Sequence, residues 1–262
     1  MQPLKREQYV QKSALSFDRV YIKDMGGHVF SIRGIEMNEI YYNKKITCPV
    51  CSTHFKGTKI KKSMLHHIKT DTDLCRYFKD ANPYYYDINV CPECGFSFSD
   101  SFEKKLSTAE IDKFLKSITA HWKKQDLCGE RSFEQAVDSL KMALLCGQVI
   151  GLKEINLAGI CLRLCWLYRE KSMTEEEKRF MKAAVGFYEK AYEMQGLNDE
   201  KEMRPELVVY LIGELNFRLG NFKDSVKWFN LAISRYSRDP AVKKQTMNMI
   251  KDRWMEIKDA MK

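Results

Sequence analysis

Two Cys-x-x-Cys pairs are the residues whose type and spacing most clearly predict chemistry. The first pair is Cys48-Pro49-Val50-Cys51 and the second is Cys91-Pro92-Glu93-Cys94. A Cys-x-x-Cys turn presents two thiolates from one tight knuckle, and two such turns supply the four soft ligands that Zn²⁺ binds tetrahedrally. The sequence therefore predicts one Zn²⁺ held by Cys48, Cys51, Cys91 and Cys94. Four protein ligands leave no open position for water or substrate, so this zinc is expected to be structural.

The residues around the two pairs leave alternatives open. Gly95 follows the second pair, and a residue without a Cβ tolerates the positive φ that turns backbone amides toward the sulfurs, whereas Ser52 follows the first pair. Residues 52–90 separate the pairs, far more than the roughly 15 to 20 residues of common zinc ribbons, so this segment must fold out as an insertion. Four residues in the insertion are of ligand type and would allow a mixed site: His54, His66, His67 and Cys75. A redox dithiol or free thiols are the remaining alternatives.

No targeting or membrane segment is evident in the sequence. Residues 1–17 carry Lys5, Arg6, Glu7 and Lys12 in place of an apolar signal core, and no apolar run approaches the ~20 residues needed to cross a bilayer. We therefore expect a cytoplasmic protein without membrane contact, in which most of the nine cysteines stay reduced.

Length and composition indicate a folded chain of two unlike halves. With 262 residues, 44% of them hydrophobic and 30% charged, a disordered or fibrous protein is excluded and two domains are favoured. The composition changes near residues 99–107, from Gly, Pro, Tyr and short β-branched runs to helical periodicity. The predicted class is α+β, mostly α. We expect an N-terminal β-hairpin extension over 1–40, a zinc-ribbon-like domain over 41–104 and a tetratricopeptide-like α-helical domain over 105–262.

The first half contains three stretches of strand type. Arg19–Arg33 is typical of a hairpin, with two apolar-rich arms around a turn at Gly26-Gly27. Lys44–Phe55 and Lys59–Thr70 are expected to supply further strands.

Seven helices are expected in the second half. Their approximate ranges are 107–124, 132–147, 152–170, 175–195, 205–219, 222–236 and 240–261. Capping boxes begin at Ser107, Ser132 and Thr174. Pro205 and Pro240 suit the first position of a helix, and Asp239 is placed to cap the last one.

The helices are predicted to form three pairs and one closing helix. In the second helix of each pair, a small residue is followed after four positions by a large one and after seven by Ala, which is tetratricopeptide spacing. The three sets are Ala136, Leu140 and Ala143; Ala184, Tyr188 and Ala191; and Ser225, Phe229 and Ala232. The intervals between sets exceed the standard repeat of about 34 residues, so helices or loops must be extended. Trp254 is expected to be buried against the last pair.

The segment from Lys45 to Phe96 resembles a known family. The motifs that carry the likeness are Lys45-Ile46-Thr47-Cys48-Pro49-Val50-Cys51 with Phe55, Asp71-x-Asp73 with Arg76 and Tyr77, Asn82-Pro83-x-Tyr85-Tyr86, and Val90-Cys91-Pro92-x-Cys94-Gly95-Phe96. They are similar to an uncharacterised bacterial family, domain of unknown function 2225, with a cysteine-rich front half and tetratricopeptide-like helices behind. The resemblance covers about Tyr41 to the C-terminus and implies a fold and a metal. It supplies no activity.

A non-catalytic interaction or adaptor protein is the function that these features favour. Arrays of helix pairs bind peptides or proteins along the surface lined by the first helices of the pairs. Six residues on those helices are candidates for the groove: Asn156, Arg163, Tyr210, Glu214, Phe217 and Arg218. The partner is an unidentified protein or peptide.

Two other functions rank lower. The net charge is +9, and a block of lysines within 44–69 makes a nucleic-acid-binding regulator the alternative, with Lys56, Lys59, Lys61 and Lys62 as its patch and Tyr84 to Tyr86 as stacking surfaces. A solvated lysine face explains the same residues more simply.

A hydrolase using Asp71 and Asp73 ranks third, because no histidine or lysine accompanies them at a recognisable spacing. We expect these carboxylates to cap turns or to pair with Arg76 and the lysine block. Cys161 and Cys165 are expected in the core.

Overall fold

The computed structural model describes residues 20–23, 29–32, 40–102, 105–194 and 203–262. Strand β1 (Val20–Lys23) pairs antiparallel with β2 (Val29–Ile32), with Val20 opposite Ile32. The two arms of the N-terminal hairpin are therefore confirmed, and its Gly26-Gly27 turn lies outside the described residues.

Two short hairpins carry the cysteine pairs in their turns. Strand β3 (Tyr41–Thr47) pairs antiparallel with β4 (His54–Ile60), and β7 (Ile88–Val90) pairs antiparallel with β8 (Ser97–Ser99). We call these two units the knuckle hairpins. The stretch Lys44–Phe55 supplies strand residues as expected, namely the end of β3 and the start of β4, and the chain reverses between them at the first cysteine pair.

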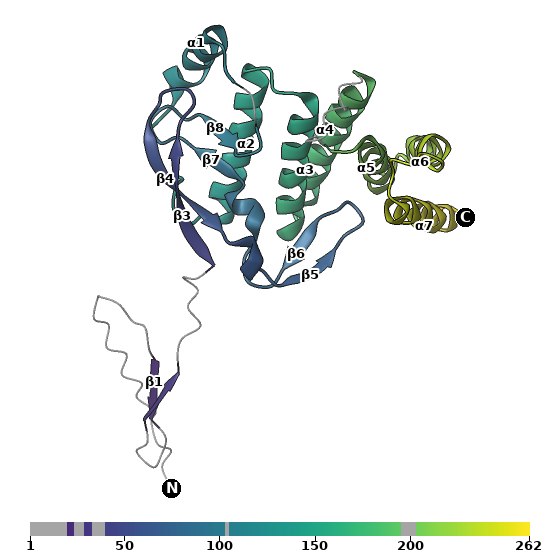
Figure 1. The fold of residues 1–262 in the computed structure, drawn as a ribbon, viewed down its shortest axis with the longest axis horizontal. Coiled ribbons are helices and arrows are strands. Elements are labelled where there is room, and N and C mark those ends of the chain that lie inside the picture. The colour runs from purple at the N-terminus through teal and green to yellow at the C-terminus, as the bar shows by residue number, and fades with distance from the viewer. Residues whose placement is uncertain (1–19, 24–28, 33–39, 103–104, 195–202) are drawn as a thin grey trace.

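A third hairpin lies in the insertion between the knuckle hairpins. It consists of β5 (His67–Thr70) and β6 (Arg76–Phe78), flanked by 3-10 helices at Lys62–Met64 and Pro83–Tyr86. The stretch Lys59–Thr70 supplies strand residues as expected, in the end of β4 and in β5, with a 3-10 turn between them. The β5–β6 hairpin extends from the strand-rich half along the helices toward α5 and α7 (Figure 1).

The rest of the described chain is helical, so the α+β, mostly α class is confirmed. The helices are α1 (Thr108–Ser117), α2 (Phe133–Val149), α3 (Glu154–Glu170), α4 (Thr174–Glu193), α5 (Pro205–Arg218), α6 (Phe222–Tyr236) and α7 (Lys244–Ala260). Successive helices from α2 to α7 pack side by side (Figure 1). Among the described residues, no helix combines the length and the apolar character needed to cross a membrane.

The helix ends follow the sequence signals in some places only. The capping boxes at Ser107 and Ser132 are present, and Pro205 opens α5. The capping box expected at Thr174 is wrong, since α4 begins after Met173 without a side-chain cap. The cap expected at Asp239 is also wrong, because its carboxylate accepts from the backbone N–H of Ala241 in a turn that precedes α7.

Helix α1 ends earlier than its periodicity predicts, because the residues that follow it bind the turn of the second knuckle hairpin. A 3-10 turn at Thr119–His121 replaces the last turns. Thr119 Oγ1 donates to the carbonyl of Cys94 at 3.0 Å, and Trp122 Nε1 donates to that of Pro92 at 3.1 Å. These bonds tie the end of α1 to the second cysteine pair.

The helices and the knuckle hairpins share one hydrophobic core. The three sets of small, large and small residues in α2, α4 and α6 are all buried, and the cluster of buried residues runs from Cys48 to Ile257. Cys161 and Cys165 are fully buried in it, as expected. Trp254 on α7 stacks on Phe229 of α6 with ring centroids 5.5 Å apart, which confirms that α7 covers the last pair.

Candidate functional site

The four predicted cysteines come together into one cluster. Their Sγ atoms all lie within 4.8 Å of one another, and the Cys48–Cys94 and Cys51–Cys91 sulfurs are 3.6 Å apart. Tetrahedral Zn²⁺ with Zn–S bonds of about 2.3 Å requires sulfurs about 3.8 Å apart, so the donor set fits this ion. Three of the thiols are buried and that of Cys51 is exposed.

The two knuckles have the same backbone geometry. The N–H of Ser52 donates to the carbonyl of Cys48, and the N–H of Gly95 donates to that of Cys91, at 3.0 and 2.9 Å. Both residues have positive φ, 59° at Ser52 and 77° at Gly95. At Gly95 a Cβ would lie 2.6 Å from the ring of Trp122, so glycine is needed both for its conformation and for this contact.

Hydrogen bonds inside the cluster already favour thiolate at one sulfur. Cys94 donates to Cys48 and lowers the pKa of Cys48 to about 5, assisted by the backbone N–H groups of Cys51 and Val50. Burial raises the pKa of Cys91 to about 11. Because metals bind cysteine as thiolate, a bound cation would supply the positive charge that ionises the buried sulfurs.

The three histidines of the insertion have hydrogen-bond partners outside the cysteine cluster, and that of His67 is Thr70 Oγ1 at 2.9 Å. His54 Nδ1 lies 3.0 Å from Thr47 Oγ1, and His66 Nδ1 lies 2.7 Å from the Asp80 carboxylate. Within the described ranges, the four cysteines are the only His, Cys, Asp and Glu group arranged to hold a metal ion. The alternative of a mixed ligand set therefore has no geometric support.

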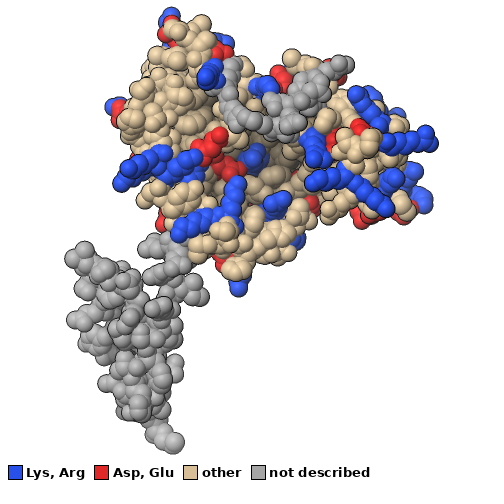
Figure 2. Space-filling model, in the orientation of Figure 1, with Lys and Arg blue, Asp and Glu red and all other residues tan. Residues whose placement is uncertain are grey.

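The lysine block is divided between buried and exposed side chains. Lys59 is only 8% exposed, and its Nζ donates to the Tyr86 carbonyl at 3.1 Å. Burial lowers the pKa of Lys59, although Asp100 opposes that effect. Lys56, Lys61 and Lys62 are exposed. On the face shown in Figure 2, basic side chains lie over both the strand-rich half and the C-terminal helices.

The tyrosines proposed as stacking surfaces have partners within the chain. Tyr85 donates to Glu170 at 2.9 Å, and the Tyr84 ring packs on that of Trp166 with centroids 4.9 Å apart. Tyr86 is buried. The three tyrosines that the sequence predicted as stacking surfaces for bases therefore anchor the insertion to the rest of the protein.

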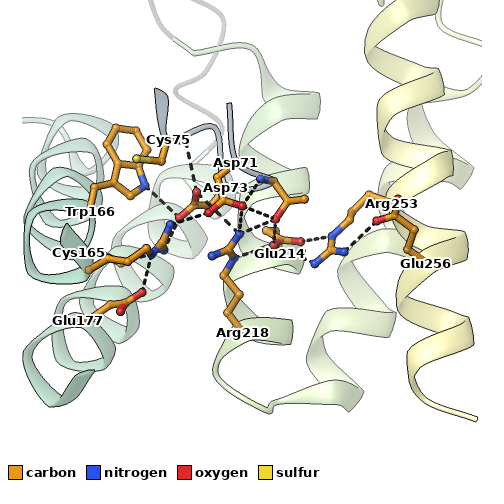
Figure 3. Close-up of polar contacts among 12 residues, drawn as sticks. Asp71, Asp73, Cys75, Cys165, Trp166, Glu177, Glu214, Arg218, Arg253 and Glu256 are labelled. Carbon is orange, nitrogen blue, oxygen red and sulfur yellow. Dashed lines mark hydrogen bonds and ion pairs between the residues drawn. The ribbon is translucent and has the colours of Figure 1, made fainter. Parts of the chain in front are cut away.

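Asp71 and Asp73 lie at the tip of the β5–β6 hairpin and pair with arginines of the helices (Figure 3). Asp73 is fully buried and accepts from Arg169 Nη2 at 2.6 Å. Asp71 accepts from Arg218 Nη2 at 2.7 Å and from Arg169 Nη1 at 3.2 Å. The expected pairing with Arg76 and the lysine block is wrong, because the hairpin reaches α3 and α5. The turn-capping part is correct, as the N–H of Cys75 donates to Asp73.

The same network continues to α7 through Glu214. This fully buried carboxylate accepts from Arg218, from Arg253 and from Thr72 Oγ1 (Figure 3). Burial alone would raise the pKa of Glu214, but these hydrogen bonds lower it below its ordinary value. Asp71 and Asp73, the two carboxylates at the hairpin tip, are thus both paired with arginines of the helices. Neither is therefore available as a general base.

The six predicted groove residues do not share one surface. Four face the hairpin tip or α7: Tyr210 donates to the Thr72 carbonyl at 2.6 Å, Glu214 and Arg218 join the network above, and Phe217 packs under Arg253. The chain's own hairpin therefore covers this part of the array. Asn156 and Arg163, on α3, line a separate cavity.

This cavity lies between the second knuckle hairpin and the helices α3 and α4. Its volume is about 1020 Å³, and Figure 2 shows the hollow with acidic and basic side chains gathered at its edge. Arg163 Nε donates to Asp87 at 2.6 Å across it. Tyr188 of α4 also lines the cavity. The sequence did not predict it as a site residue, because its position in the helix repeat indicated packing alone. No pattern in the sequence marks Asp87 as the ion-pair partner of Arg163.

The sequence profile of an uncharacterised family conserved in bacteria, DUF2225, matches residues 41–257, so the chain belongs to this family. The resemblance carried by the cysteine pairs and their flanking motifs is thereby confirmed. No curated protein and no solved structure shows a significant match to the chain. The family description assigns no activity, which leaves geometry as the guide to function.

Proposed function

We propose that this chain is a non-catalytic, zinc-stabilised binding protein whose cavity between the second knuckle hairpin and α3–α4 receives a segment of a protein or peptide partner. The observation that carries the proposal is that this cavity and the cysteine cluster share one hairpin. One wall, β7–β8, belongs to the hairpin whose turn supplies two of the four ligands. A structural metal would therefore hold that wall in place.

The chemistry of the lining supports binding without catalysis. The one carboxylate among the described lining residues, that of Asp87, forms an ion pair with Arg163. No nucleophile paired with a base lies among the lining residues that the structure describes. Four thiolates would also close the zinc shell, so the metal offers no site for a reacting water.

The packing of the last helix pair supports a tetratricopeptide-like array. A Cβ built at Gly213 would lie 2.8 Å from the Phe229 ring, so α5 and α6 need a small residue opposite a large one. This is the contact that the repeat pattern predicts. We also propose a cytoplasmic location, because a reducing compartment keeps cysteines available as thiolate ligands.

Blocking the cavity tests the proposal. Asn156→Trp puts a large ring on the α3 wall, and we expect it to abolish capture of those native-lysate proteins that bind the wild-type chain. Asn248→Trp, at an exposed position of α7, is the matched control and is expected to keep them. Retention of the same partners by folded Asn156→Trp protein with normal metal content would refute the cavity as the partner site.

The exposed lysines near β4 lead to a separate prediction about nucleic acid. A protein that neutralises several phosphates loses affinity by orders of magnitude between ~50 and ~200 mM salt, whereas an apolar peptide contact changes little. We expect no sequence-selective binding at physiological salt, measured by fluorescence anisotropy. Submicromolar selective binding that disappears on Lys61→Glu with Lys62→Glu would instead establish the nucleic-acid alternative.

A further inference from the structure

We infer that the cavity recognises a carboxylate joined to an apolar body, with Arg163 and Tyr188 as the residues that bind the charged end. The inference rests on the proposed function, because it names the chemistry of the group that the same cavity receives. The carboxylate has two candidate sources, the C-terminus of a peptide chain and a free organic acid, and both present the same group to the protein.

The charge of the lining favours an anion. Among the described lining residues, the basic side chains are those of Lys105, Lys153 and Arg163, and the acidic one is that of Asp87, which pairs with Arg163. The described part of the lining therefore carries more basic than acidic side chains, and low-dielectric walls concentrate the effect of such charges on a small ligand.

Arg163 retains donor capacity toward the cavity after its internal contacts are made. Its Nε donates to Asp87 and its Nη1 donates to the Gly159 carbonyl at 2.9 Å, while Nη2 has no partner among the described residues. Burial would lower the pKa of Arg163, but Asp87 outweighs that effect and raises it, so the guanidinium stays charged. The Asp87 contact fixes the orientation of the guanidinium plane, and a fixed guanidinium is suited to binding a carboxylate.

Tyr188 supplies a second donor that nothing in the described protein satisfies. The residue is 0% exposed, and its hydroxyl has no hydrogen-bond partner. A buried hydroxyl left unpaired is costly, and an acceptor oxygen in the cavity would remove that cost. Burial raises the pKa of Tyr188, so the group remains a protonated donor. Tyr210 on α5 is equally buried, yet its hydroxyl donates to the Thr72 carbonyl.

The rest of the lining suits an apolar body attached to the anion. Ile88, Leu152, Ile155 and Ile160 are buried around the cavity, and Phe102 and Met203 lie at its margin. Ligand sites combine such apolar walls with a few placed polar groups, and a volume of about 1020 Å³ is at the upper end of their usual range. A bare inorganic anion would leave these walls without contacts.

Two matched pairs of small probes separate charge from shape. Hexanoate is compared with hexanol, and N-acetylleucine with N-acetylleucine amide, by ligand-detected NMR titration at constant ionic strength. We expect each acid to bind at least about tenfold more tightly than its neutral partner, because a hydrogen bond to a charged group is worth more than one between neutral groups. N-acetylleucine mimics the C-terminus of a peptide and hexanoate represents a free organic acid. The acid that binds more tightly therefore identifies the source of the carboxylate.

Two tyrosine variants test the assignment of the donor. Tyr188→Phe removes a hydroxyl that makes no bond in the described protein, so its melting temperature should not fall, while its affinity for the acids should drop about tenfold. Tyr210→Phe removes a bonded hydroxyl outside the cavity and should lower stability while leaving acid binding unchanged.

The outcomes distinguish this inference from the proposed function. Equal binding of acid and neutral partner, or unchanged acid binding by Tyr188→Phe, would overturn carboxylate recognition while the cavity remained a binding site. Failure of all four probes to bind wild-type protein would also overturn the inference, whereas the cavity's role in capturing a partner is decided separately by Asn156→Trp.

Discussion

Removal of the metal is expected to unfold the two knuckle hairpins while most of the helical structure persists. The strands of β7–β8 are three residues long, and isolated two-stranded hairpins are marginal in water even when longer. Structural zinc contributes ~10 kcal/mol or more in small domains, so we expect the hairpins to need a bound metal for their fold. The helices α3 to α7 bury one another and do not need the metal for their own packing.

Hydrogen exchange after treatment with a chelator measures this effect segment by segment. Amides of β3, β4, β7 and β8 should lose protection, followed by the face of α2 against which β8 packs, while α4 to α6 stay protected. Cys91→Ser should reproduce the effect without chelator. Cys128→Ser, half-buried near the second knuckle but outside the cluster, is the matched control and should retain the native pattern. Unchanged protection of the strands after metal loss would contradict the account.

Asp73→Asn is expected to lower the free energy of unfolding by about 1 to 3 kcal/mol, because it removes a buried charge that accepts from Arg169. Arg169 keeps Asp71 and Glu177 as partners, so the loss is smaller than for a fully uncompensated charge. Asp73 is fully buried and Arg169 is 16% exposed, so water cannot replace the lost charge. Asparagine has nearly the same shape as aspartate, so the substitution changes mainly the charge. Urea unfolding of the metal-loaded protein measures the loss.

A neighbouring carboxylate provides the control for this substitution. Asp80 pairs with the exposed His66 in the same insertion, and Asp80→Asn is expected to leave stability unchanged. Trp166 Nε1 donates to Asp73 at 3.0 Å, so its fluorescence in the native state reports whether the hairpin tip has moved from α3. Equal stability losses in the two variants would show that the buried network does not hold the hairpin on the helices.

Local patterns were sufficient to predict the four-cysteine cluster and most helices. The two cysteine pairs are defined by spacing within each knuckle, which is why Cys48, Cys51, Cys91 and Cys94 could be named although a long insertion separates them. The capping boxes at Ser107 and Ser132 could likewise be recognised locally, because each is defined by two residues three positions apart. At residues 239–243 the local signals fit either a helix start or a turn, and the structure contains a turn.

Contacts between distant segments explain what the sequence could not provide. Asp73 and Arg169 lie 96 positions apart, and Asp87 and Arg163 lie 76 apart. Neither pair has a spacing rule, because each depends on how the insertion lies on the helices. Tyr188 has the periodic position of a packing residue, and only its unpaired hydroxyl indicates a further role.

The metal content of the purified chain tests the central claim most directly. Protein prepared without added metal should contain one zinc per chain by elemental analysis and native mass spectrometry, and the Cys91→Ser variant should have lost it. A metal-free wild-type chain that is fully folded, or an unchanged zinc content in Cys91→Ser, would contradict a zinc-stabilised binding protein.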